Sequence, residues 1–332
     1  MQVSVLGAGA WGTALATVLA ARQHQVRLWT WDPAHAAAMN RSRENAASLP
    51  GVPLDPSIRV SPELEVVLAD AELVLVVVPS QAVGATARQA APFLASGAAV
   101  VCATKGIDAV TLELMHEVLG RELGIEQDRL CALSGPSFAR EVARQLPTNL
   151  VAAAFSPELA RRVQEALVTD WLRVYTSADP VGVEVGGALK NVIAIAAGAC
   201  DGLGLGENTR AALITRGIAE MARLTLAKGG DRLTMAGLAG VGDLVLTCTG
   251  SLSRNRALGI KLGQGQALEQ ALAESQGVAE GYFTAKSAVL LAEKLGVDLP
   301  ISAAVESVLY GGRSPVEALR SLLGRPLHAE WD

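Results

Sequence analysis

Aromatic side chains make up only 4% of this 332-residue chain and charged side chains only 18%, whereas half of all residues are apolar. Such a high apolar content excludes intrinsic disorder, which requires few apolar residues and a high net charge. The interior must therefore be built mainly from Ala, Val and Leu. At about 100–200 residues per domain, this length predicts two domains with a large buried core.

The chain has no excess of positive charge, because 28 Lys and Arg residues oppose 33 Asp and Glu residues and give a formal net charge of −5. The overall charge therefore does not attract nucleic acid or anionic lipid, and we expect no nucleic-acid partner. An anionic small molecule would need a local cluster of cations.

Paired cysteines are missing as well, since no CxxC spacing of the kind found in zinc or redox sites occurs. The first 21 residues carry no charged side chain, but they lack the basic segment of a signal peptide and are interrupted by glycines. Other uncharged stretches are too short or too often broken by Pro and Gly to span a bilayer. We expect a cytoplasmic protein without metal or membrane insertion, and buried thiols at Cys102, Cys131, Cys200 and Cys248.

From Gln2 to about Thr176, short β-branched runs alternate with Ala- and Leu-rich segments of helical periodicity, a pattern typical of βα units on a parallel sheet. Several runs are apolar at consecutive positions, as expected where helices cover both faces of the sheet. The expected strands are Val3–Leu6, Val26–Trp29, Leu73–Val78, Ala99–Ala103, Leu130–Leu133, Leu150–Ala154 and Arg173–Tyr175.

After about Asp179 the β-rich runs stop, and apolar residues recur at three- and four-residue spacing, which predicts helices. The expected helical segments are Val181–Cys200, Thr209–Lys228, Leu268–Ala273, Thr284–Leu295 and Ile301–Tyr310. We therefore predict an α/β protein in which a Rossmann-type, doubly wound parallel sheet (residues 1–178) precedes an all-α C-terminal domain (residues 179–332). No flexible linker separates them, so a cleft between the domains is the expected ligand site.

A glycine-rich turn lies directly after the first expected strand and before a helix expected over Thr13–Ala21: it reads Gly7-Ala8-Gly9-Ala10-Trp11-Gly12. The first glycine permits a tight turn, the second lets the backbone approach a pyrophosphate, and the third lets the helix close on the strand. Free N–H groups at the helix N-terminus would hold the phosphates. This context predicts a dinucleotide site; the alternative is a packing turn in an α/β protein with another ligand.

Trp31 and Asp32 follow the second expected strand, where an acid usually binds the ribose of NAD and a cation binds the 2′-phosphate of NADP. Asp32 fits the NAD role, but it equally fits the cap of a helix that begins at Pro33. The choice between NAD(H) and NADP(H) therefore stays open, with Arg41 and Arg43 shortly downstream as possible phosphate partners.

Lys190 is the strongest candidate for a catalytic group, because it lies in an Ala-, Val- and Gly-rich helix with few other polar residues. Desolvation lowers the pKa of a buried ammonium and an acidic partner raises it, so such a lysine can exchange a proton near neutral pH. The alternative is a lysine whose stem packs while its ammonium reaches solvent.

Four further segments carry groups that suit a phosphorylated, carbonyl-containing substrate. Lys105 follows a buried strand at the ligand-binding edge of the sheet, and residues 134–139 (SGPSFA) offer backbone N–H groups and a hydroxyl, or alternatively an ordinary capping turn. Residues 240–243 (GVGD) end in a carboxylate, and residues 253–256 (SRNR) supply arginines suited to bidentate phosphate binding.

These residues resemble the bacterial and eukaryotic NAD(P)-dependent glycerol-3-phosphate dehydrogenases, specifically the bacterial biosynthetic type, and the resemblance runs from end to end. The matching motifs are GAGAWGTALA at 7–16, RENAASLPG at 43–51, VVPS at 77–80, ATKG at 103–106, LSGPSFAREVA at 133–143, GALKNVIAIAAG at 187–198, ALITRGIAEM at 212–221, GLAGVGDLVLTCTGSLSRNR at 237–256, VAEGYFTAK at 278–286, and Pro300 followed by LLGR at 322–325.

The resemblance implies reduction of dihydroxyacetone phosphate to sn-glycerol 3-phosphate, a phospholipid precursor, by a Rossmann domain and a 6-phosphogluconate-dehydrogenase-like helical domain. It makes Lys190 the proton donor and acceptor, and it implies no metal. The implied substrate residues are Lys105, Gly135, Ser137, Lys190, Asp243, Ser253, Arg254 and Asn255; the cofactor residues are Gly7, Gly9, Ala10, Trp11, Gly12, Trp31, Lys105, Ala139, Arg254, Val278 and Glu280.

Two other functions are compatible with this architecture, and each requires sequence features that differ from those of this chain. A β-hydroxyacid or 6-phosphogluconate-type dehydrogenase shares the architecture and an active lysine, but the SRNR and ATKG segments favour glycerol 3-phosphate. A redox sensor without turnover would lack the lysine or the phosphate site, and this chain keeps both. The oligomeric state, monomer or homodimer, is not determined by the sequence.

Overall fold

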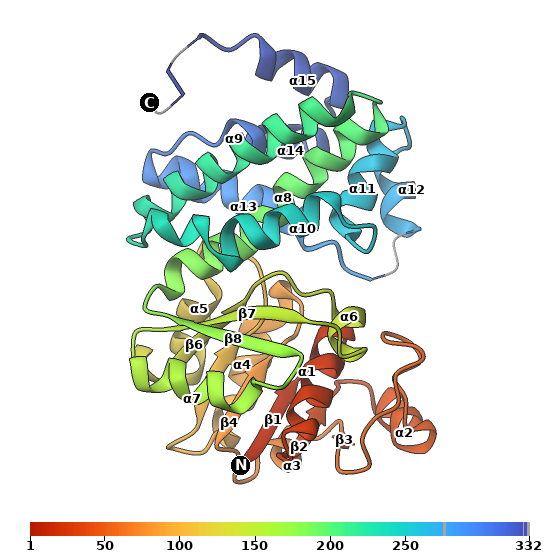
Figure 1. Cartoon of the computed structure of the whole chain (residues 1–332), viewed down its shortest axis with the longest axis vertical. Coiled ribbons are helices and arrows are strands. Elements are labelled where there is room, and N and C mark those ends of the chain that lie inside the picture. The colour runs from red at the N-terminus through yellow and green to blue at the C-terminus, as the bar shows by residue number, and fades with distance from the viewer. Residues whose placement is uncertain (275–276, 328, 331–332) are drawn as a thin grey trace.

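The computed structural model describes residues 1–274, 277–327 and 329–330. In Figure 1 the sheet and its helices form the lower half of the molecule, and a bundle of helices forms the upper half. The strands are β1 (Gln2–Leu6), β2 (Gln25–Trp29), β3 (Arg59–Ser61), β4 (Leu73–Val76), β5 (Ala99–Cys102), β6 (Leu130–Ser134), β7 (Thr148–Ala154) and β8 (Leu172–Ser177).

The sheet has the order β3-β2-β1-β4-β5-β6-β7-β8. Reversal of the strand order at β1 and β4 is the doubly wound topology, which places ligands at the carboxyl ends of these central strands. All seven expected strands are confirmed to within two residues at each end. The short edge strand β3 was not expected, because its three residues include one apolar side chain, Val60.

The expected parallel sheet is confirmed except at one pair: β7 runs antiparallel to β6, whereas its other neighbour, β8, is parallel to it. Residues 135–147 join the two strands and contain a helix of only five residues, α6 (Ala139–Ala143). A parallel crossover usually needs a longer connection with a full helix. The shorter link reverses the chain instead.

Helices cover both faces of the sheet. On β4, Leu73 and Leu75 belong to one core cluster and Val74 and Val76 to the other, so successive side chains are buried on opposite faces. The helices in this half are α1 (Ala10–Ala21), α2 (Pro33–Ser42), α3 (Leu64–Leu68), α4 (Val83–Ala90), α5 (Met115–Leu123), α6 and α7 (Pro157–Leu167). Helix α1 begins three residues before the expected Thr13.

The second half is helical, as predicted. Its helices are α8 (Pro180–Gly202), α9 (Gly206–Ala227), α10 (Asp243–Thr249), α11 (Arg254–Gly263), α12 (Leu268–Ala273), α13 (Glu280–Leu295), α14 (Pro300–Leu309) and α15 (Pro315–Leu323). All five expected helical segments are confirmed. Helices α10 and α15 were not expected, and both are short. The start of α11 coincides with the SRNR segment.

Helix α8 is the central element of this half. Its length and composition would allow it to cross a membrane, but 89% of its most apolar window is buried inside the protein, which is the environment of a core helix. Three of the cysteines are buried as expected, whereas Cys200, near the end of α8, is partly exposed.

Paired glycines bring α8 and α11 into backbone contact. A Cβ atom at Gly198 of α8 would lie 2.0 Å from the carbonyl oxygen of Arg256, and one at Gly259 of α11 would lie 2.0 Å from that of Ile195. Neither position can hold a larger residue without separating the helices. This contact determines where the N-terminus of α11 lies relative to the middle of α8.

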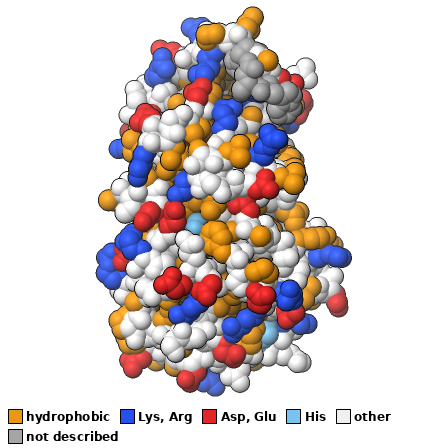
Figure 2. Space-filling model, turned by 90° about the vertical axis from the view of Figure 1, so that its left-hand side faces the viewer, with side chains coloured by type: hydrophobic (Ala, Val, Ile, Leu, Met, Phe, Trp, Pro, Cys, Tyr) orange, Lys and Arg blue, Asp and Glu red, His pale blue; other side chains and the backbone are white. Residues whose placement is uncertain are grey.

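On the face shown in Figure 2, acidic and basic side chains intersperse with apolar ones, and neither sign of charge dominates. Any selectivity for an anion must therefore come from a local site.

Candidate active site

Two lysines from different halves of the molecule share one buried carboxylate. Lys105 lies in the loop after β5, and its Nζ is 2.6 Å from Oδ2 of Asp243, the first residue of α10. Lys190, in the middle of α8, donates to Oδ1 of the same carboxylate. Thr247, one turn after Asp243, accepts a hydrogen bond of 3.0 Å from the Lys190 ammonium. Lys190 and Asp243 were both implied as substrate residues by the sequence, and the structure brings them into direct contact.

The three charges shift one another's proton affinity. Burial lowers the pKa of Lys190, Asp243 partly opposes this effect, and the nearby Lys105 cation reinforces it. Burial alone would raise the pKa of Asp243, but the attraction of Lys105 and Lys190 outweighs it and lowers that pKa. Asp243 is therefore a fixed anion, and Lys190 is a buried ammonium that releases its proton more readily than an exposed lysine.

The SRNR segment forms the start of α11, where free N–H groups favour an anion. Ser253 is the N-cap, and its hydroxyl accepts from the backbone N–H of Arg256 at 3.2 Å. Asn255 is buried; its amide donates to Asn191 at 2.9 Å, and its oxygen accepts from the backbone of Gly281 at 2.9 Å. Arg254 stays exposed. Among these three expected substrate residues, the side chain of Arg254 is the one most accessible to a ligand.

The SGPS turn joins β6 to α6 beside Lys105. Gly135 has a φ of +134°, and a Cβ there would lie 3.0 Å from the carbonyl oxygen of Asn149, so the turn requires glycine. The Ser137 hydroxyl donates to the backbone oxygen of Gly135 at 3.0 Å, which stabilises the turn. Ala139 begins α6. The preceding Ser134 is buried, and its hydroxyl has no hydrogen-bond partner among the described residues.

The glycine-rich turn between β1 and α1 has the geometry of a dinucleotide site. Gly7 has a φ of +122°, and a Cβ at Gly12 would lie 1.8 Å from the Gly7 carbonyl oxygen, so both positions require glycine. At Gly9, the exposed N-cap of α1, a Cβ would have no atom within 4 Å. The backbone is therefore accessible where a pyrophosphate would approach the helix N-terminus, with Ala10 and Trp11 in its first turn.

Family models for NAD-dependent glycerol-3-phosphate dehydrogenase match both halves, the N-terminal model over residues 2–160 and the C-terminal model over residues 179–320. The chain belongs to this family. It is 52% identical to a glycerol-3-phosphate dehydrogenase [NAD(P)+] of Citrifermentans bemidjiense, over 99% of this chain and 98% of that protein. It is 49% identical to the protein of the same name from Thioalkalivibrio sulfidiphilus, over 99% of this chain and 98% of that protein.

A solved structure agrees with the family. The crystal structure of glycerol-3-phosphate dehydrogenase from Coxiella burnetii is 39% identical and superimposes with a TM-score of 0.94, covering 97% of this chain and 98% of the other. The Rossmann-type fold and the helical second half are therefore those of this family. As a member of the family, the chain is an NAD(P)-dependent oxidoreductase, in agreement with the expected cofactor class.

At the end of β2, Asp32 occupies the capping position that was one of its two expected roles. Asp32 is the N-cap of α2, and its carboxylate accepts from the N–H of Ala34 at 2.8 Å. Trp31 beside it is 78% exposed, an indole face available to a planar ligand. Arg43 instead donates to the backbone oxygens of Asp55 and Ile58.

Glu280 begins α13 and makes a contact that the sequence did not predict. Its carboxylate accepts from the hydroxyl of Ser80 at 2.5 Å and from the backbone N–H of Ser80 at 3.3 Å. Burial raises the pKa of Glu280, and the hydrogen bonds from Ser80 oppose that effect. Since Ser80 follows β4, this pair joins the second half to the carboxyl edge of the sheet. Val278, two residues earlier, is partly buried in the same segment.

The structure thus brings Lys105, Lys190 and Asp243 into direct contact and links Asn255 to the residue after Lys190. Among the described residues, no hydrogen bond or ion pair joins Trp31, which follows β2, to that cluster. Its implied role at the cofactor stays a prediction. Sequence reasoning missed Thr247, Asn191 and Ser80. Thr247 lies four residues after Asp243, a spacing that places both on one helix face, and this could have identified it.

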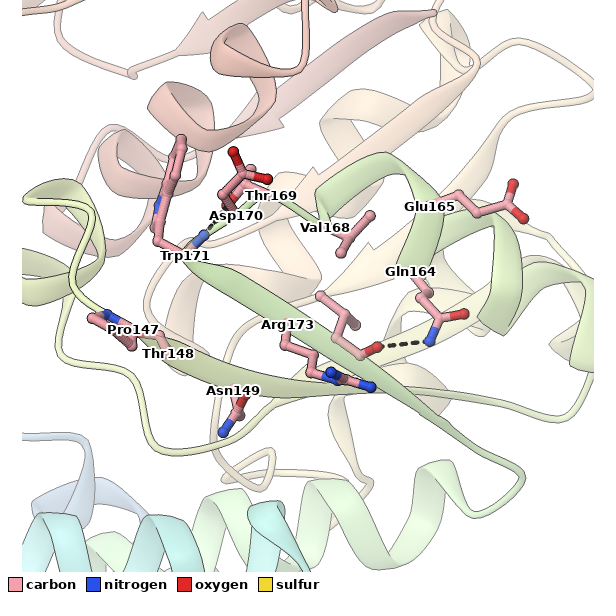
Figure 3. Close-up of a pocket in the computed structure, with 11 residues that line it drawn as sticks. Pro147, Thr148, Asn149, Gln164, Glu165, Val168, Thr169, Asp170, Trp171 and Arg173 are labelled. Atoms are coloured by element: carbon pink, nitrogen blue, oxygen red, sulfur yellow. Dashed lines mark hydrogen bonds between the residues drawn. The ribbon is translucent and has the colours of Figure 1, made fainter.

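A separate hollow of about 460 Å³ lies between α7, β7 and the edge strand β8 (Figure 3). In it, Gln164 donates to the backbone oxygen of Val174 at 2.6 Å. Asn149 and Arg173 lie along the strands, as Figure 3 shows. Neither lysine of the buried cluster lines this hollow, so it is distinct from the candidate active site.

Proposed function

We propose that this protein reduces dihydroxyacetone phosphate to sn-glycerol 3-phosphate with NADH or NADPH. This proposal rests mainly on the buried cluster of Lys190, Asp243 and Lys105, which lies in a member of the glycerol-3-phosphate dehydrogenase family. The cluster provides a cation at a desolvated position. Such a cation stabilises the negative charge that develops on the oxygen of a ketone during its reduction.

In this proposal the substrate phosphate lies at the N-terminus of α11, held by Arg254 and by free backbone N–H groups. The ketone oxygen faces Lys190. A nicotinamide dinucleotide held at the glycine-rich turn would supply hydride for C2 of the ketone. The Lys190 ammonium stabilises the developing alkoxide and donates its proton to it; in the reverse direction, neutral Lys190 accepts the hydroxyl proton.

Asp243 holds Lys190 by an ionic hydrogen bond, and the Thr247 hydroxyl accepts a second hydrogen bond that orients the Lys190 ammonium. Lys105 adds a second positive charge beside the reacting oxygen and the phosphate. Gly135 and Ser137 shape the turn that faces this cluster, while Ser253 and Asn255 hold the start of α11 in place.

For the cofactor, the residues present fit a dinucleotide, since Gly7, Gly9 and Gly12 leave room for a pyrophosphate at α1. We assign the adenosine end to Trp31. The remaining cofactor contacts of the proposal are Ala10, Trp11, Lys105, Ala139, Arg254, Val278 and Glu280.

The same proposal places the domain boundary between residues 178 and 179, which the end of β8 at Ser177 and the start of α8 at Pro180 support. The product suits glycerophospholipid synthesis in the cytoplasm, without nucleic acid, metal or membrane insertion. Either a monomer or a homodimer is compatible with a site whose described residues come from one chain.

The test follows the absorbance of NADH and then of NADPH with dihydroxyacetone phosphate as substrate. Lys190→Ala is expected to lower kcat by at least about 100-fold, because general acid catalysis typically contributes 10²–10⁴-fold. Lys261→Ala, at an exposed ion pair with Glu274, is the matched control. Near-normal turnover by Lys190→Ala would refute the assignment, and no turnover by the unmodified protein would refute the reaction.

A further inference from the structure

The helical half contains a cavity of about 670 Å³ between α8, α9, α14 and α15. Ile195 and Ala199 of α8 line it, but Lys190 and Asp243 do not, so it is separate from the candidate active site. Its volume lies within the roughly 300–1,000 Å³ range of small-molecule pockets.

The lining of the cavity follows α9 over most of that helix. It extends from Thr209 to Arg223, which is about 21 Å at 1.5 Å per residue. An extended alkyl chain can lie along a lining of this length.

Its walls are mainly aliphatic. Leu213 of α9 and Val305 of α14 lie opposite α8, and α15 covers the cavity with Leu319 and Leu322. Of the residues in α15, only Ala318 is fully buried, and Leu323 is 78% exposed. The apolar face of α15 is thus incompletely packed, and an apolar ligand beneath it would cover this surface.

The polar lining groups gather at the end where α14 begins. Arg223 donates to the backbone oxygen of Asp298 at 3.0 Å, and Arg325 forms an ion pair with the Asp298 carboxylate. Glu220 accepts from the backbone N–H of Ser302 at 3.1 Å. Arg216, one turn before Glu220, also lines the cavity and donates to a backbone oxygen of the C-terminal segment.

These groups leave the polar end positively charged, because three arginines oppose the carboxylates of Asp298 and Glu220. Burial raises the pKa of Glu220 to about 7, although hydrogen bonds from Ile301 and Ser302 oppose it. Its negative charge is therefore partial near neutrality. An anionic head group would find complementary charge here, and a cationic one would be repelled.

We propose that this cavity binds a single-chain amphiphile whose head is a phosphomonoester, with the alkyl chain along α9 beneath α15 and the head beside Arg216, Arg223 and Arg325. A guanidinium group can bind two oxygens of one phosphate at once. The two negative charges of a phosphomonoester also match the excess of arginine better than the single charge of a carboxylate. A peptide would leave backbone polar groups unpaired against the aliphatic walls.

The test titrates the full-length protein with dodecyl phosphate below its critical micelle concentration and measures heat of binding. We expect saturable binding of one ligand per chain. Dodecanoate, with one charge, should bind more weakly, and dodecyltrimethylammonium should not compete. Arg216→Gln/Arg223→Gln should weaken the affinity for dodecyl phosphate by about tenfold or more, since each tenfold corresponds to about 1.4 kcal/mol. The matched control is Arg232→Gln, at an exposed arginine outside the cavity.

A second variant, Ala304→Phe, places a ring in the cavity from α14 and should abolish binding while thermal unfolding remains cooperative. If this variant does not fold, the arginine variant alone decides. Absence of saturable binding to the unmodified protein overturns the proposal, as does equal affinity for the cationic surfactant. Unchanged affinity in the arginine variant, or in a folded Ala304→Phe protein, also overturns it.

Discussion

The carboxylate of Asp243 is the group whose loss should change the chemistry most distinctly without removing a lysine. Asp243→Asn keeps the shape of the side chain but removes the negative charge between Lys105 and Lys190. At an effective dielectric constant of about 20, opposite charges about 3 Å apart attract by roughly 5 kcal/mol. Removing one partner of a buried ion pair typically costs about 3–5 kcal/mol, since the remaining charge is left uncompensated.

The remaining ammonium groups can avoid this cost by releasing a proton. Burial lowers the pKa of Lys190 to about 7, and Asp243 is the group that raises it, so the substitution should lower it further. Lys190 must be protonated to reduce the ketone. We therefore expect kcat for reduction at neutral pH to fall by about 100-fold or more, and its decline with rising pH to begin at lower pH.

The assay is the pH dependence of kcat in both directions, with cofactor binding measured separately. Oxidation of glycerol 3-phosphate needs neutral Lys190, so its pH profile should move in the same direction while its maximum falls less. Asp128→Asn, at an exposed acid, serves as the control. An unchanged pH profile, with a fall in kcat smaller than about tenfold, would refute the assignment of Asp243 as the partner that holds the proton on Lys190.

Four further outcomes follow from the structure. Arg254→Ala should raise KM for dihydroxyacetone phosphate and weaken discrimination against dihydroxyacetone; an unchanged KM would place the phosphate elsewhere. The unmodified protein should accept NADH at least comparably to NADPH, and Trp31→Arg should shift the ratio of kcat/KM values toward NADPH by roughly tenfold or more. A preference of the unmodified protein for NADPH by about a hundredfold would refute this interpretation of the loop. Gly259→Ala should lower the unfolding free energy by about 1–3 kcal/mol in denaturant titrations, because its Cβ would lie 2.0 Å from an α8 carbonyl oxygen; Gly97→Ala, with open space, should not. Glu220→Gln should remove the pH dependence that this carboxyl gives to stability: measured against the variant, the wild type should be roughly 3 kcal/mol more stable below about pH 4.5, where the carboxyl is neutral, than above about pH 7, where it is charged.

The order of elements could be predicted because each signal is local. An apolar run such as Leu73–Val76 is buried on both faces, and the sequence shows this directly. The direction of β7 could not be predicted, because it depends on whether residues 135–147 cross the sheet or reverse. That outcome is determined by packing of the whole connection rather than by periodicity.

For the site, sequence reasoning found groups that carry charge and missed those that orient them. Lys190 is conspicuous because an ammonium in an apolar helix needs an anionic partner. Thr247 and Asn191 are ordinary polar residues whose importance appears only when their hydrogen bonds to Lys190 and Asn255 are known. Glu280 was expected to contact the cofactor, and its bond to Ser80 shows that it also joins the two halves.

Close contacts at the glycines of α8, together with the hydrogen bonds of the lysine itself, determine the position of Lys190. A Cβ at Gly186 would lie 2.5 Å from the carbonyl oxygen of Ala239, just before Asp243, and one at Gly187 would lie 3.3 Å from Cγ of Lys105. Together with Gly198 against α11, these glycines let three neighbouring segments approach α8 closely. Each of those segments carries a group of the proposed site: the carboxylate, the second lysine, and the start of α11 with Arg254. The glycine-rich composition that makes α8 look like an ordinary apolar core helix is therefore what lets these groups converge on the lysine.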